Sequence, residues 1–170
     1  MPKKRSVLKA IHEQFQSGDV EKIYWTLVKG CWVSKTEVTE VLAPLKKNQL
    51  SSGERIVRVQ EEGQWSLTEF RVLKRYTDTT LLEARPKTGR THQIRVHATH
   101  AGYPIVGDDK YGDASFNRLM KNKGFMRLFL HAYEITVKLP GQENPISIQA
   151  PLESRLQACL LTLNEDKFDD

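Results

Sequence analysis

Residues 85–97, RPKTGRTHQIRVH, hold four cationic side chains and two histidines but no aspartate or glutamate. Arg85, Lys87 and Arg90 stand in or beside a loop that leads into a predicted helix. Backbone N–H groups at a helix N-terminus favour anions, and neighbouring arginine and lysine side chains add positive charge. The segment therefore predicts a phosphate site, and a solvated basic surface is the alternative.

Arg95 differs from these cations because it lies between Ile94 and Val96, on a helix that we expect to be half buried. A buried arginine needs a carboxylate partner. The partner is either any nearby acid in a structural ion pair, or a catalytic acid that the arginine keeps ionised. The local sequence does not decide between the two.

Histidines and acids in this region also allow a metal site. On a helix, His92 and His97 would lie about 140° apart, so His92, His97 and His100 cannot together meet one ion. Asp108 and Asp109 follow in GDD, but aspartates are common in turns without metal. A metal-dependent hydrolase that uses His97, His100 and Asp108 is thus a remote alternative, and we expect no metal.

Composition narrows the class of protein. The chain has 170 residues, 39% of them hydrophobic, a net charge of +5 and a pI of about 9.2. These values predict one globular domain and permit a polyanionic partner. The sequence has no membrane-length apolar stretch, no secretory h-region and no nucleotide-binding glycine loop. Further basic residues near aromatics would suit unpaired RNA, and the two cysteines suggest reduced thiols in a cytosolic protein.

The elements that must position these residues mix helices and hairpins. Val7, Leu8, Ile11 and Phe15 predict a helix over residues 5–16. A second helix is expected over 92–101, with Thr91 as N-cap and Gly102 after its end, and others over 114–122 and 152–164. Strands are expected over 22–30, 36–42 (ending before Pro44), 55–59, 68–76, 80–85, 127–140 and 145–151, with a polar loop over 46–54. This order predicts an α+β fold with a mixed, largely antiparallel sheet flanked by helices.

Three longer motifs resemble one family. GRTHQIRVHATHAGYPIVGDDKYG (89–112), RLFLHA (127–132) and KIYWTLVKG (22–30) are similar to the motifs of the RluA/RluC/RluD-type pseudouridine synthases. The resemblance extends over nearly the whole chain. It implies isomerisation of uridine to pseudouridine in large-subunit ribosomal RNA, with no metal and no organic cofactor, by a cytoplasmic monomer.

The resemblance also implies roles for residues of this chain. Tyr24 would stack on the target uracil, Arg95 would pair with the catalytic aspartate, and Leu130 would line the pocket beside them. Arg90 and His92 would lie in the loop near the RNA, and Arg85 to Arg90 would hold the flanking phosphates.

One part of the family pattern has no counterpart in the chain. The family's catalytic aspartate lies in an H-R-L-D-x-x-T-S-G motif, and no H-R-L-D occurs in the sequence. We therefore expect residues 1–170 to form one catalytic domain that begins after this motif and lacks the small N-terminal RNA-binding domain. Such a chain would be inactive alone, and the alternative is a non-catalytic RNA-binding truncation.

Overall fold

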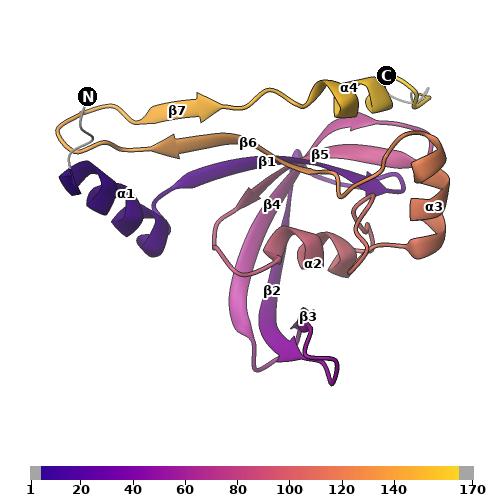
Figure 1. Ribbon diagram of the computed structural model, residues 1–170, viewed down its shortest axis with the longest axis horizontal. Helices are drawn as coiled ribbons and strands as arrows, with labels where there is room; N and C mark the ends of the chain where they lie inside the picture. Colours follow the sequence, from indigo (N-terminus) through magenta and orange to yellow (C-terminus); the bar gives the residue numbers. More distant parts are fainter. Residues whose placement is uncertain (1–4, 165–170) are drawn as a thin grey trace.

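The computed structural model describes residues 5–164, which form one seven-stranded sheet with helices on both faces (Figure 1). The strand order is β3-β2-β4-β5-β1-β6-β7, and every neighbouring pair is antiparallel. The predicted α+β fold is thus confirmed. In chain order the elements are α1 (Arg5–Ser17), β1 (Glu21–Lys29), β2 (Val38–Gln49), β3 (Arg55–Val59), β4 (Gln64–Arg75), β5 (Thr79–Pro86), α2 (Gln93–His100), α3 (Ala114–Asn122), β6 (Leu130–Val137), β7 (Ile146–Gln149) and α4 (Ser154–Leu160).

The two faces of the sheet bury different clusters, because successive side chains of a strand point to opposite faces. On one face Leu82 of β5 packs with Ile94 of α2, which lies against β2, β4 and β5. On the other face Leu81 of β5 packs with Met120 of α3 and Leu156 of α4. Figure 1 shows α2 beside the long strands β2 and β4, and α3 and α4 near the other end of the sheet. Burial of each such side chain stabilises the fold by about 1.5–3 kcal/mol.

The second strand is longer than the sequence predicts. We expected it to end before Pro44, but β2 continues through Pro44 and takes in the first four residues, 46–49, of the predicted polar loop. Proline normally disrupts a sheet because it lacks an N–H donor. Here the Pro44 carbonyl accepts from the Gln60 amide on the β3 side, and the β2–β3 ladder begins only at Leu45 and Val59. The missing donor therefore falls at the end of that ladder, where it breaks no strand pairing.

The helices begin and end close to the predicted residues, with one change at α2. His92, not Thr91, is its N-cap, and no side chain forms a capping hydrogen bond there. Gly102, with φ of 91°, follows the helix as predicted. The last helix is shorter than expected and covers only Ser154–Leu160. Among residues 5–164, no helix is long and apolar enough to cross a membrane.

Candidate active site

A cleft of about 420 Å³ opens where the loop before α2 faces β1 and the start of β6. Its apolar wall combines Tyr24 of β1 with Ile94, Leu128 and Leu130. Its polar side combines the cations Lys22, Arg90 and Arg95 with His92. The remaining lining residues are Pro86, Thr88, Gly89 and Gln93. An aromatic and aliphatic wall beside several cations suits a flat ring that is attached to an anion.

Five of the seven site residues expected from the sequence therefore share one cleft: Tyr24, Arg90, His92, Arg95 and Leu130. They come from three parts of the chain, which the sheet brings together because β1 pairs with β6 on one side and with β5 on the other. Tyr24 is opposite Ala84 of β5 and Ala132 of β6. Both of these neighbours have small side chains.

Burial raises the pKa of Tyr24 above that of a free phenol. The hydroxyl group is therefore protonated at neutral pH, and the side chain presents a neutral ring to the cleft. The ring is half-buried and packs against the core cluster that includes Ile94 and Leu82. Tyr24 is thus held on the rigid sheet, which favours a stacking role.

Gln93 fixes the loop that forms the polar side of the cleft. Its side-chain oxygen accepts from the Thr88 hydroxyl at 2.7 Å and from the Arg90 amide at 3.0 Å. Its side-chain nitrogen donates to the Leu67 carbonyl at 2.9 Å and to the Thr68 hydroxyl at 3.0 Å. All four hydrogen bonds that a glutamine amide can form are therefore made inside the protein. The side chain is only 4% exposed, so it fastens the loop to β4.

Arg95 makes a two-point ion pair with Asp108. Its Nε donates to Oδ2 at 2.8 Å and its Nη2 donates to Oδ1 at 2.7 Å. Asp108 is 1% exposed, and its Oδ1 also accepts from the backbone N–H groups of Lys110 and Tyr111, each at 3.0 Å. The structural ion pair that the sequence left open is therefore formed within the chain.

The energetics of this pair follow from its surroundings. Burial pushes the pKa of Asp108 upward, but the hydrogen bonds from Arg95 and from the two backbone amides outweigh burial and leave the pKa lowered. The hydrogen bonds to Asp108 raise the pKa of Arg95 against the opposing effect of burial. Both groups are therefore charged at neutral pH. An arginine has five N–H donors, so Arg95 keeps an edge that can face a second acid or a phosphate in the cleft.

His92 connects this ion pair to the loop. Its Nδ1 lies 2.8 Å from the Tyr111 hydroxyl, which also accepts from the Val57 amide, and the Arg95 guanidinium lies over the Tyr111 ring at 4.9 Å. His92 has φ of 54°, a left-handed backbone that is uncommon outside glycine. Burial, and next Arg95, lower the pKa of His92. The imidazole is therefore neutral near pH 7.

Arg85 and Lys87 do not line the cleft. Arg85 shares a side of β5 with Leu81 and Glu83, away from α2, and its Nε donates to Glu83 at 2.8 Å. Lys87 pairs with Glu69 at 3.0 Å. The acids missing from residues 85–97 thus come from an earlier position of β5 itself, Glu83, and from the neighbouring strand β4, Glu69. The predicted contact of these two cations with RNA phosphate stays a prediction.

The histidines near α2 have protein partners as well. His97 is fully buried, and its Nδ1 lies 2.9 Å from the Thr68 hydroxyl. Burial lowers the pKa of His97 to about 4. Within the described residues, no group of three His, Cys, Asp or Glu side chains is arranged to hold a metal ion.

Sequence reasoning missed several members of this site. Lys22 lines the cleft from the first position of the 22–30 motif, and its alternation with Tyr24 on one strand face was an available signal. Gln93 and Tyr111 lie inside the quoted motif but had no role assigned from sequence. Asp108 was set aside because it belongs to a turn, and its distance of 13 residues from Arg95 gave no local cue.

The antiparallel α+β scaffold and the cleft with its aromatic and cationic lining can be compared with those of known proteins. Residues 2–100 match the family described as RNA pseudouridylate synthase. The chain belongs to this family, as its motifs predicted.

Curated relatives are similar along nearly the entire chain. Ribosomal large subunit pseudouridine synthase C of Pasteurella multocida is 50% identical over 165 residues, which are 97% of this chain and 50% of the relative. The protein of the same name from Escherichia coli (strain K12) is 48% identical over 163 residues, or 95% of this chain and 50% of the relative. The chain thus spans about half the length of these relatives.

Two solved human structures share the fold. Human RNA Pseudouridylate Synthase Domain Containing 1 superposes with a TM-score of 0.75 at 24% identity, over 96% of this chain and 66% of that one. Human RNA Pseudouridylate Synthase Domain Containing 4 gives a TM-score of 0.69 at 25% identity, over 95% of this chain and 69% of that one.

Proposed function

We propose that the chain is part of an RNA pseudouridine synthase and that its cleft receives a uridine of large-subunit ribosomal RNA. The observation that carries the proposal is the single cleft in which Tyr24 and Leu130 face Arg90 and Arg95. The names of the relatives support the ribosomal substrate. The target uridine must leave its stack to reach such a cleft.

Each residue has a defined part in this proposal. Tyr24 stacks on the uracil and holds it when the bond to ribose is broken, because a free base would diffuse away. Leu130 closes the apolar side of the base. Arg95, oriented by Asp108, directs its remaining N–H groups at the acid that acts on the ribose, and keeps that acid ionised. No cofactor takes part, and the enzyme works in the cytoplasm as a monomer.

The cleft of the described chain supplies no acid for the ribose. None of its lining residues is an aspartate or glutamate, and Asp108 is buried and bound to Arg95. We therefore expect residues 1–170 to bind RNA without isomerising it. A non-catalytic RNA-binding protein is the second candidate function, and the same lining favours it.

Tritium release tests the proposal. Ribosomal RNA is transcribed with uridine tritiated at carbon 5, because formation of the new carbon bond displaces that hydrogen. Filter retention of the same RNA measures binding. Retention without release is the expected result. Tritium release by this chain would show that catalysis needs no acid from outside the chain. Failure of the chain to retain the RNA on the filter would show that it does not bind RNA.

A further inference from the structure

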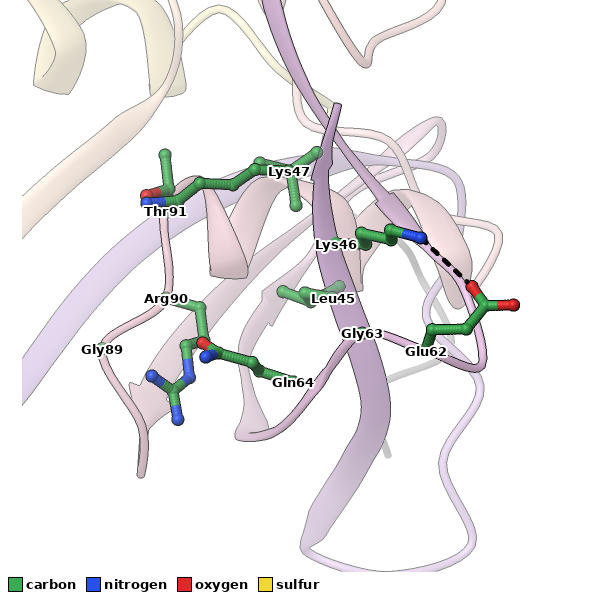
Figure 2. Close-up of a pocket in the computed structure, with 10 residues that line it drawn as sticks. Leu45, Lys46, Lys47, Glu62, Gly63, Gln64, Gly89, Arg90 and Thr91 are labelled. Atoms are coloured by element: carbon green, nitrogen blue, oxygen red, sulfur yellow. Dashed lines mark hydrogen bonds and ion pairs between the residues drawn. The ribbon is translucent and has the colours of Figure 1, made fainter. Parts of the chain in front are cut away.

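A second cleft lies on the other side of the loop that borders the Tyr24 cleft. It has a volume of about 350 Å³ and is formed by β2, the turn between β3 and β4, and the loop before α2 (Figure 2). Gly89 and Arg90 line both clefts, so one short loop separates them. The other residues of the second cleft are Leu45, Lys46, Lys47, Val57, Glu62, Gly63, Gln64 and Thr91.

Two cations of this second cleft lack a counter-charge. Within residues 5–164, neither Lys47 nor the Arg90 guanidinium has an ion-pair or side-chain hydrogen-bond partner. In Figure 2, Lys47 extends from β2 toward Thr91, and the Arg90 side chain lies near Gln64. The positive charges therefore approach the cleft from two different elements, unlike Arg85 and Lys87, which are neutralised by glutamates.

The acid at this cleft is already neutralised. Glu62 lies 3.4 Å from Lys46, and this ion pair neutralises the carboxylate of the cleft. The positive charges of Lys47 and Arg90 are therefore not neutralised by Glu62. The floor is apolar, because Leu45 and Val57 belong to a buried cluster with Val96 of α2. An apolar floor with cations above it suits a sugar–phosphate unit, in which the ribose packs below and the phosphate meets the charges.

We propose that this second cleft binds the sugar–phosphate of a nucleotide next to the target uridine, with Lys47 and Arg90 on its phosphate. The proposal rests on the proposed function, since the Gly89–Arg90 wall separates the base in the first cleft from the backbone in the second. The RNA strand would cross this wall between adjacent nucleotides. Lys47 is then a binding residue that the family motifs in the sequence do not include.

The test measures binding of the full chain to the pentanucleotide AAUAA by fluorescence anisotropy. Lys47→Gln removes one phosphate contact, so affinity should fall about 5- to 10-fold, and the slope of log K against log salt should decrease by about 0.7. Lys35→Gln is the matched control, because Lys35 is exposed and precedes the opposite end of β2, roughly 30 Å away at about 3.3 Å per residue. The control should bind like the unaltered chain.

A neutral methylphosphonate in place of one flanking phosphate identifies the contact. With the linkage that occupies the cleft neutralised, the Lys47→Gln penalty should disappear, since the charge pair is already broken. A Lys47→Gln variant that binds AAUAA with unchanged affinity and salt slope would overturn the proposal. If the loss of affinity caused by Lys47→Gln persists whichever of the two phosphates beside the uridine is replaced by methylphosphonate, the proposal is also overturned.

Failure of the proposed function has a different result. If the unaltered chain binds AAAAA as tightly as AAUAA, and Tyr24→Ala changes neither affinity, then the Tyr24 cleft does not bind uridine. The Lys47 measurement on the same oligonucleotides still reports whether the second cleft holds phosphate.

Discussion

Replacing Asp108 with alanine removes the buried half of the ion pair with Arg95. Asp108 is 1% exposed and accepts two hydrogen bonds from Arg95 and two from backbone amides. Loss of one member of a largely buried pair typically costs about 3–5 kcal/mol, because Arg95, whose side chain is 18% exposed, and the two backbone N–H groups are left without their acceptor. We expect a loss of that size in the free energy of unfolding.

Urea denaturation measures this loss. With a slope of about 2 kcal/mol per molar urea, the midpoint should fall by roughly 1.5 to 2.5 M. Asp109→Ala is the matched control, since Asp109 is exposed beside Asp108 and should change the free energy by less than about 0.5 kcal/mol. A loss below about 1 kcal/mol for Asp108→Ala would show that the ion pair does not stabilise the fold.

The same pair gives a pH dependence with a definite sign. The folded-state pKa of Asp108 is below the ordinary value of 3.8, so ionised Asp108 stabilises the folded chain above that pH. This contribution is lost as the pH falls below about 4. Asp108→Ala should therefore remove part of the acid sensitivity of the chain.

Three further outcomes follow from the site. Since the pKa of His97 is about 4 when folded and 6.5 otherwise, the free energy of unfolding should fall as the pH falls from 6.5 to 4, by on the order of 1.4 kcal/mol per pH unit. NMR titration of the His97 ring checks this, and a pKa near 6.5 would contradict it. Gln93→Leu leaves several buried polar groups unpaired and should cost roughly 2–4 kcal/mol. Hydrogen exchange of the Arg90 amide should then rise, and unchanged exchange would show that Gln93 does not fix the loop. Tyr24→Ala should weaken binding of AAUAA but not of AAAAA in anisotropy, whereas Tyr24→Phe should preserve both, and equal losses on both RNAs would argue against uracil stacking.

The sequence predicted the elements whose local patterns are strong. Alternating β-branched and aromatic residues identified β1, and the hairpin of β4 and β5 followed from their spacing. The roles of Tyr24 and Arg95 were predicted from the family motifs, because a tyrosine or an arginine alone is compatible with many roles. Pro44 predicted the end of the second strand, and the local sequence could not show that β2 continues through it, since that depends on where the β3 ladder begins.

The partners of Lys87 and Arg95 are distant from them in sequence. Lys87 appeared unneutralised because Glu69 reaches it only through the β4–β5 register. Glu83 lies two residues before Arg85 on the same side of β5, so strand alternation could have predicted that pair from the sequence. Asp108 lies in a turn and reaches Arg95 only after α2 packs on the sheet. Local patterns contain no information on such pairs, so the electrostatics of the site required the structure.

Photo-cross-linking can show directly whether uridine occupies the Tyr24 cleft. Large-subunit ribosomal RNA transcribed with 5-bromouridine is irradiated with the chain, and the nucleotide adduct is located by mass spectrometry after trypsin digestion. The account predicts an adduct on the peptide of residues 23–29, at Tyr24, and its loss in Tyr24→Ala. Adducts found only on peptides that do not line this cleft, such as the one that contains the exposed Trp65, would contradict the account.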